Sequence, residues 1–387
     1  MQPLTIDDLK ILARKRVPRM FYQYVDTGSW TGGTYRANED DFSRLWFKQR
    51  VAIDIEQRDT RSLMIGQEAA MPVAIAPTGL TGMQYPDGEI AAARAAREVG
   101  VPFTLSTMSV CSIEDVAAGT DGHPFWFQLY LMRDRAFMER LIGRAKDAGC
   151  SALMLTLDLQ VSGQRHQDIR NGLSVPPRFG VRTALDLASR PGWCLRMLGT
   201  KRRNFGNIFG HVEGVDDMRS LSAWSAQQFD PRLDWRDVEW VKRQWGGKLI
   251  LKGIQAVEDA RLAVESGADA LVVSNHGGRQ LDGAQSSITA LPAIVEAVGR
   301  QIEVHMDGGI RSGQDVLKAL ALGARGTYIG RAMLYGLGAM GETGVALALR
   351  ILHKELHTTL GFCGRTRIDQ VDRDILVDEA RGFGPRR

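Results

Sequence analysis

Cysteine is scarce in this chain, and the few cysteines are not grouped. The 387 residues include only Cys111, Cys150, Cys194 and Cys363, with no C-x-x-C pair and no cysteine–histidine pair at metal-ligand spacing. This scattering disfavours a disulfide framework or a zinc site and favours reduced thiols, as in the cytoplasm. We therefore expect no metal centre.

Long apolar runs, a leader segment and a strong net charge are also lacking. No window approaches the roughly 20 uninterrupted apolar residues that a spanning helix needs. The start from Met1 to Asp8 has neither the basic nor the apolar part of a signal peptide. A net charge of only +4 argues against a nucleic-acid partner. We expect a cytoplasmic protein that is at most peripherally attached to the inner face of the cell membrane.

The chain does contain a repeated alternation of short apolar runs and alanine-rich amphipathic segments. The predicted strands are Pro72–Ala76, Phe103–Leu105, Trp126–Leu129, Ala152–Thr156, Leu249–Lys252, Ala270–Ser274, Glu303–Asp307 and Gly326–Gly330. Helical patterns between them include Glu89–Val99, Arg135–Ala148, Val257–Ser266 and Gln314–Leu322. Eight such units predict one α/β domain over residues 1–387, a (β/α)₈ TIM barrel over about 71–360. An open doubly wound sheet is the alternative, weakened because no G-x-G-x-x-G follows the first strand.

Two regions lie outside this repeat. Thr5 to Asp8 resembles a capping box that opens an N-terminal helix, whose pattern runs on towards Tyr24. Roughly 90 residues separate the fourth and fifth strands, far above ordinary loop length, and predict an insertion over about 173–235. Between Arg178 and Arg203 this insertion is basic, with apolar residues interspersed and a single acid. It is either a mobile lid with a solvated basic face or a segment that lies on anionic lipid.

The sixth strand leads into Ser274-Asn275-His276-Gly277-Gly278-Arg279. In a barrel, groups at this end of a strand form the catalytic site. An imidazole can take a proton, and a guanidinium can hold a carboxylate with two parallel hydrogen bonds. Asp158, after the fourth strand, is the candidate that orients the imidazole. These groups suit removal of hydrogen from a 2-hydroxy acid. The remaining histidines are interpreted as structural or surface residues: His123, His166, His211, His305, His353 and His357.

Lys252 and the last two units predict a cofactor site. Lys252 closes an apolar strand, so it is either a Schiff-base nucleophile or a fixed positive charge beside an electron-accepting cofactor. The His276–Arg279 pair favours the second interpretation. Residues 307–313 and 329–331 combine glycines with Arg311 and Arg331, and Ser312 is expected to cap the helix that follows. Loops after the seventh and eighth barrel strands commonly bind phosphate.

These motifs resemble those of the FMN-dependent L-2-hydroxy-acid oxidoreductases, from the N-terminal helix to about Gly364. The segments that carry the resemblance are Ser274–Asp282, Ala76–Leu80, Leu105–Thr107, Phe127–Tyr130 and Asp307–Arg311. Residues 229–231, Phe-Asp-Pro, favour the subgroup that oxidises L-lactate, with the mandelate and glycolate enzymes as the other subgroups.

The resemblance implies FMN as cofactor and a role for each matched residue. His276 would be the base, Asp158 its partner, and Lys252 the charge that stabilises the reduced flavin. The substrate would be bound by Tyr24, Tyr130, Arg165 and Arg279. The flavin ring and ribityl chain would contact Thr78, Gly79, Ser106, Gln128, Thr156, Lys252 and Ser274. The ribityl chain and phosphate would be held by Asp307, Gly309, Arg311, Gly330 and Arg331.

The resemblance also implies partners. We expect a small 2-hydroxy acid, L-lactate first with L-mandelate as the alternative, and a homo-oligomer, by resemblance a tetramer. Gly79 stands where oxidases of the family tend to carry alanine, which favours a quinone over oxygen as acceptor. Two other classes stay open. A phosphate-binding barrel isomerase or aldolase would leave His276 and Arg279 without a role, and a non-catalytic membrane-binding protein would explain only the basic insertion.

Overall fold

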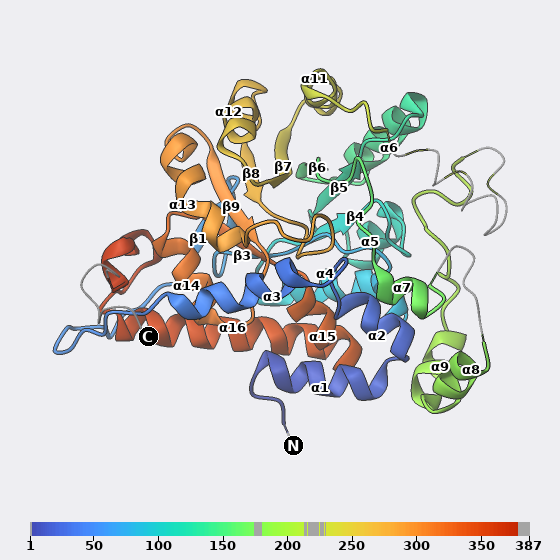
Figure 1. The fold of residues 1–387 in the computed structure, drawn as a ribbon, viewed down its shortest axis with the longest axis horizontal. Coiled ribbons are helices and arrows are strands. Elements are labelled where there is room, and N and C mark those ends of the chain that lie inside the picture. Colours follow the sequence, from blue (N-terminus) through green and yellow to red (C-terminus); the bar gives the residue numbers. More distant parts are fainter. Residues whose placement is uncertain are drawn as a thin grey trace.

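The architecture is an all-parallel sheet closed into a barrel. The computed structural model describes residues 2–173, 180–212, 215, 224, 228 and 230–377. The strands are β3 (Val73–Ile75), β4 (Thr104–Ser106), β5 (Trp126–Tyr130), β6 (Ala152–Thr156), β7 (Lys248–Ile254), β8 (Ala270–Val273), β9 (Glu303–Asp307) and β10 (Gly326–Ile329). They pair in the order β3-β10-β9-β8-β7-β6-β5-β4, and a parallel bridge between Ile75 and Phe103 joins the two ends of this order. The predicted TIM barrel is confirmed (Figure 1), and the open sheet is excluded.

Alternating side chains build two apolar layers. In β6, Met154 belongs to a small cluster inside the barrel, whereas Leu153 and Leu155 pack outwards in the larger core under the helices. This is the two-residue period of a strand with both faces buried. β7 is longer than predicted: Gly253, at φ +103°, accompanies a register shift and lets the strand continue to Ile254. Lys252 therefore lies within the strand and does not close it.

Helices cover the outside of the barrel in the predicted alternation. They are α4 (Gly88–Val99), α5 (Ile113–Gly119), α6 (Arg135–Asp147), α11 (Trp235–Trp245), α12 (Val257–Glu265), α13 (Ser287–Val298), α14 (Gly313–Ala321) and α15 (Arg331–Met340). The predicted cap of α14 is confirmed, since Ser312 and Asp315 form a capping box. Short 3₁₀ turns occupy Asp41–Arg44, Thr81–Met83, Ile368–Gln370 and Arg373–Ile375.

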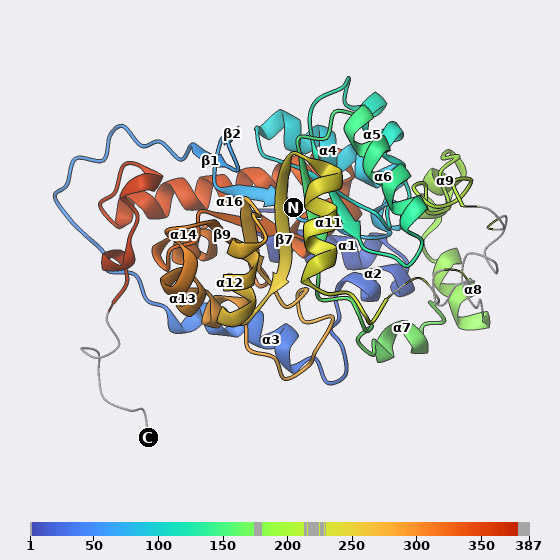
Figure 2. The same ribbon diagram turned by 90° about the horizontal axis from the view of Figure 1, so that it is seen from above.

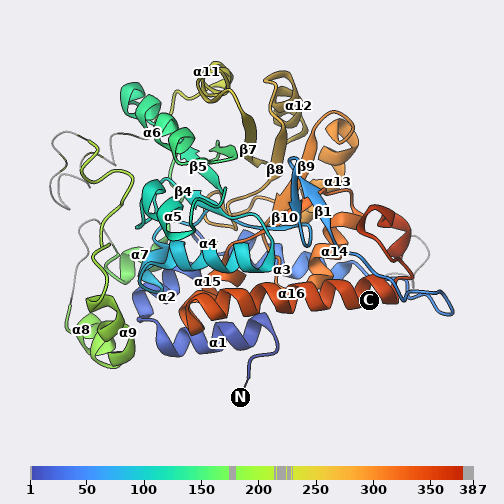
Figure 3. The same cartoon turned by 180° about the vertical axis from the view of Figure 1, so that it is seen from behind.

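The N-terminal extension consists of α1 (Ile6–Arg16), α2 (Arg19–Val25) and α3 (Gly33–Asp40). The expected continuous helix is wrong, because Val17 is extended ahead of Pro18, as residues before proline prefer. Helix α1 packs against α15 and lies near the long α16 (Glu342–Phe362) below the barrel (Figure 1). The hairpin of β1 (Ser62–Met64) and β2 (Gln67–Ala69) lies at the amino-terminal end of the barrel strands (Figure 3). There Met64 lies against Gly326, the first residue of β10.

The segment between β6 and α11 carries α7 (His166–Arg170), α8 (Val181–Ala188) and α9 (Pro191–Leu198), which gather at one side of the barrel (Figure 2). Trp193 stacks on Phe21 at 5.3 Å between ring centroids and donates to the Met83 carbonyl. Asp186 accepts a hydrogen bond from the backbone N–H of Arg19 at 2.6 Å. Helices α8 and α9 are thus fixed to α2. Among the described helices, none is both long and apolar enough to cross a bilayer.

Candidate active site

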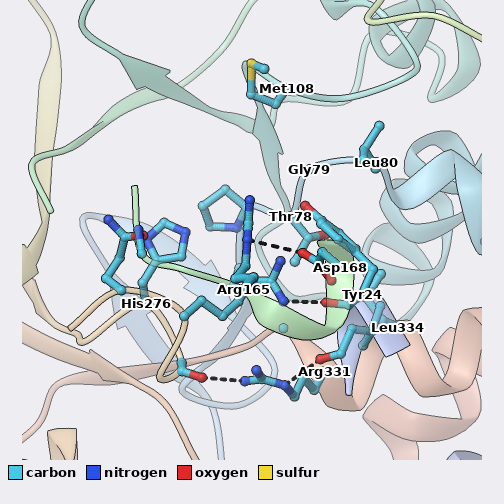
Figure 4. A pocket seen from close by; sticks show the side chains of 18 of the residues that line it. Tyr24, Thr78, Gly79, Leu80, Met108, Arg165, Asp168, His276, Arg331 and Leu334 are labelled. Atoms are coloured by element: carbon cyan, nitrogen blue, oxygen red, sulfur yellow. Dashed lines mark hydrogen bonds and ion pairs between the residues drawn. The ribbon is translucent and has the colours of Figure 1, made fainter. Parts of the chain in front are cut away.

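A cavity of about 720 Å³ opens at the carboxyl ends of the barrel strands, within the roughly 300–1,000 Å³ of small-molecule sites. Many of the site residues predicted from the sequence line its wall, and they come from segments along most of the chain. These are Tyr24, Thr78, Gly79, Tyr130, Arg165, Lys252, His276, Arg279, Asp307, Gly309, Arg311, Gly330 and Arg331. Figure 4 shows Tyr24, Arg165 and Asp168 close together, with His276 beside them and Met108 farther out.

His276 and Asp158 form the pair that the sequence predicted. The Nδ1 atom of His276 lies 3.0 Å from Oδ1 of Asp158. Burial alone would raise the pKa of Asp158, but His276 and Lys252 outweigh it and hold that pKa below its ordinary value. An ionised Asp158 keeps the proton on Nδ1, so Nε2 is the ring atom available to accept a proton from a substrate.

Two guanidinium groups lie beside Tyr24. Arg279 donates through Nη1 to the Tyr24 carbonyl, and its guanidinium carbon is 4.4 Å from the Tyr24 ring centroid, against 5.7 Å for Arg165. The Nη2 atom of Arg279 is buried with no hydrogen-bond partner. Burial and the neighbouring Arg165 lower the pKa of Arg279 to about 10, so it stays charged at neutral pH. This arrangement is suited to bind a carboxylate.

Asp168 is a site residue that the sequence analysis missed. Its Oδ2 atom lies 3.2 Å from Nε of Arg165, and its Oδ1 atom is buried without a partner. Burial raises the pKa of Asp168 although both Arg279 and Arg165 oppose the shift. The spacing of three residues between Arg165 and Asp168 is the sequence signal that could have found Asp168, because residues i and i+3 share a helix face. The five-residue helix α7 that provides this face is too short to show a sequence period.

Lys252 points into a charged cluster at the bottom of the cavity. Its Nζ atom lies 2.9 Å from Oδ2 of Asp307 and donates to Oγ of Ser274 at 2.8 Å. Burial favours the neutral amine, but the carboxylates of Asp307 and Asp158 outweigh it and raise the pKa of Lys252. A Schiff-base nucleophile must be neutral, so the geometry favours the fixed positive charge.

The two arginines of the predicted phosphate cradle have different surroundings. Arg311 donates to Glu39 at 2.7 Å. Arg331 donates to three carbonyl oxygens, those of Val25, Thr27 and Gly277, at 2.8–2.9 Å. Arg331 therefore joins the N-terminal extension to the loop that carries His276, a contact that could not be predicted from the sequence.

The chain's relationships agree with this geometry. The sequence model of the family described as FMN-dependent dehydrogenase matches residues 13–378. The chain belongs to this family. It is 43% identical over 378 residues to the L-lactate dehydrogenase of Caulobacter sp. (strain K31), covering 97% of this chain and 98% of that protein. The predicted family and its cofactor, FMN, are confirmed.

This FMN-dependent dehydrogenase has the same fold as solved structures of related enzymes. The crystal structure of the monotopic membrane protein (S)-mandelate dehydrogenase superposes with a TM-score of 0.93 at 36% identity, covering 98% of this chain and 100% of that one. Mandelate oxidase with (S)-4-hydroxymandelic acid gives a TM-score of 0.83 at 36% identity, covering 97% and 98%.

The residues around the cavity of this FMN-dependent dehydrogenase fit a flavin. Five predicted residues are not in the cavity wall. Ser106, Thr156, Asp158 and Ser274 lie at or just after the ends of their strands, and Gln128 lies in the middle of β5. Nε2 of Gln128, Oγ1 of Thr156 and Oδ1 of Asp307 are buried without any hydrogen-bond partner. Buried polar atoms are rarely left unpaired. The ring nitrogens and carbonyl oxygens of an isoalloxazine, with the ribityl hydroxyls, are of the type that would satisfy them.

One histidine outside the site has partners that the sequence analysis overlooked. His305 is fully buried, with Nδ1 3.1 Å from the Tyr328 hydroxyl and Nε2 3.1 Å from Glu303. Residues 303 and 305 share a face of β9, so the two-residue spacing was a usable signal. Glu303 also accepts from the backbone of Ile65 in the β1–β2 turn, so this histidine is structural, as interpreted.

Proposed function

We propose that this chain oxidises an L-2-hydroxy acid, with L-lactate as the first candidate, to the 2-oxo acid and passes the electrons to a quinone. The proposal rests above all on one observation. His276, whose imidazole bonds Asp158, lines the same cavity as Arg165 and Arg279, so a base and a carboxylate site lie within reach of one small molecule. The relatives named L-lactate dehydrogenase support the choice of lactate.

Some residues of the site bind the substrate, and others transfer its proton. Arg279, together with Arg165, binds the substrate carboxylate, and the hydroxyls of Tyr24 and Tyr130 bond its oxygens. His276 takes a proton from the substrate at Nε2, and Asp158 stabilises the imidazolium that forms. Bound FMN supplies the acceptor for the two electrons and the second hydrogen. Lys252 provides positive charge at the bottom of the cavity throughout the reaction.

An anaerobic flavin titration tests this function. The holoenzyme is mixed with L-lactate and separately with L-mandelate, and the flavin absorbance is followed before and after air is admitted. Bleaching by L-lactate at lower concentration supports the proposal, and preferential bleaching by L-mandelate would favour the second candidate suggested by the mandelate dehydrogenase fold. Failure of every 2-hydroxy acid to bleach the flavin would reject the function. Rapid recovery in air would mark oxygen, not quinone, as the acceptor.

An exposed apolar surface on α8 and α9 supports the proposal of a quinone acceptor. Val181, Leu185, Leu195 and Leu198 are 79%, 66%, 69% and 71% exposed. In each helix the two apolar residues are three or four positions apart, hence on one face. Exposed arginines and a lysine lie in the same segment of the sequence, the combination expected of a segment that lies on anionic lipid. The related mandelate dehydrogenase is a monotopic membrane protein, and we propose the same attachment here in preference to a solvated lid.

Replacing Leu195 and Leu198 together with aspartate is expected to weaken attachment to the membrane strongly. Each buried leucine contributes about 1.5–3 kcal/mol, so sedimentation with phosphatidylglycerol vesicles should weaken more than about tenfold. Flavin reduction by substrate should not change, since neither side chain reaches the cavity. Leu63→Asp, similarly exposed on β1, is the matched control. If the double variant sediments like the original chain, the membrane surface is wrong and the lid interpretation stands.

A further inference from the structure

The loop that carries the proposed base has an unusual backbone. His276, Gly277 and Gly278 all lie in the left-handed region, at φ +58°, +64° and +72°. Three consecutive residues do not keep a left-handed conformation without further contacts, and a non-glycine residue in this region is strained. Two hydrogen bonds within the loop, from the His276 N–H to Ser274 Oγ and from the Gly278 N–H to Asn275 Oδ1, help to hold this conformation. Contacts from elsewhere in the chain add to them and help to direct the His276 imidazole towards Asp158.

Those contacts come from residues 25–38 of the N-terminal extension. The fully buried Ser29 donates its N–H to the Gly278 carbonyl at 2.9 Å and its hydroxyl to the Gln280 carbonyl at 2.5 Å. Asn38 and Asn275 exchange two amide hydrogen bonds of 2.8 Å. A Cβ on Gly278 would lie 2.5 Å from Tyr35 Cα, so the two segments are in direct backbone contact.

The segment that makes these contacts depends on one residue of the loop. Helix α3 begins at Gly33 with glycine as its N-cap, and no side chain of its own caps it. Asp282 supplies the missing acceptors from across the interface. Its Oδ1 accepts from the Thr34 N–H at 2.9 Å, and its Oδ2 accepts from the Thr31 N–H at 2.9 Å and the Thr31 hydroxyl at 2.6 Å.

We propose that Asp282 is a positioning residue for catalysis: by capping α3 it holds residues 29–38 against the loop and so keeps His276 in its strained conformation. The carboxylate provides three acceptor contacts at the positive end of a helix. No neutral side chain of similar size can reproduce them, since the amide of an asparagine at this position would place an N–H against an N–H. This inference rests on the proposed role of His276 as the base. The part that concerns the conformation of the loop does not depend on that role.

The test compares Asp282→Asn with Asp234→Asn in the holoenzyme. Asp234 caps the outer helix α11 with the same chemistry and does not line the cavity, so it is the matched control. In Asp282→Asn, amide hydrogen exchange should accelerate over residues 29–38 and 275–284, and flavin reduction at saturating L-lactate should slow by about tenfold or more, as for a misplaced catalytic group. Asp234→Asn should change exchange only in α11 and leave reduction unchanged. Thr31→Val, which removes one hydrogen bond to Asp282, should show a smaller effect of the same kind.

The outcomes separate the possible roles. If Asp282→Asn lowers the melting temperature while flavin reduction stays within about twofold, Asp282 is only a helix cap and the proposal is overturned. Unchanged exchange in the loop would overturn it as well. If Asp282→Asn does not retain FMN, flavin reduction and hydrogen exchange are measured on Thr31→Val instead. The same results then decide whether Asp282 is only a helix cap. If the original chain is reduced by no hydroxy acid, the proposed function fails, while the exchange data still decide whether Asp282 holds the loop.

Discussion

Replacing His276 with asparagine is expected to slow reduction of the bound flavin by L-lactate about 10²- to 10⁴-fold, the usual contribution of a general base. Asparagine removes the imidazole, yet it tolerates the left-handed backbone at φ +58° better than alanine does. The loop should therefore keep its shape and FMN should remain bound. Stopped-flow absorbance under anaerobic conditions measures the rate directly.

The control for this experiment is His123→Asn, which lies outside the cavity wall and should leave the rate unchanged. Asp158→Asn adds a second comparison. The amide can still bond Nδ1 of His276, but it no longer stabilises the imidazolium, so the rate should fall although the ring stays in place. Reduction of His276→Asn by lactate within about tenfold of the original rate would reject His276 as the base.

The barrel could be predicted because its signals are local. Each strand is an apolar run of a few residues bounded by turn-forming residues, and β6 and β9 occupy the predicted residues. Errors arose where one residue changed the backbone course. Pro18 splits the N-terminal helix, and Gly253 carries β7 two residues beyond Lys252. Both residues are visible in the sequence, but their consequence depends on what the neighbouring segments allow.

The site residues likewise include some that could be predicted from the sequence and some that could not. His276, Arg279 and Lys252 stand in motifs whose chemistry can be read from residue types, so they were found. Asp168 lies on a very short helix and contacts Arg165 at its N-cap, so no sequence period marks it. Asp282 contacts residues that are distant in the chain, and such contacts are set by tertiary packing. The same applies to Arg331, whose three carbonyl partners come from two segments remote in the chain.

Replacing Arg279 with lysine is expected to lower kcat/KM for L-lactate about 10- to 100-fold. The loss corresponds to one charge-assisted hydrogen bond of about 1.5–3 kcal/mol, because lysine keeps the charge but loses the second donor of the fork. Most of the change should appear in KM, since the carboxylate is bound in the ground state as well as in the transition state. Arg165→Lys should cost less, because Arg165 is partly exposed and already paired with Asp168.

Lactamide provides the decisive comparison, since it replaces the substrate carboxylate with a neutral amide. If Arg279 binds the carboxylate, the original chain should already be slow with lactamide, and Arg279→Lys should add little to that loss. The two changes would then be strongly non-additive, as expected for groups in direct contact. A variant that loses the same factor with lactate and with lactamide would show that Arg279 acts elsewhere, through its hydrogen bond to the Tyr24 carbonyl and its contact with the Tyr24 ring.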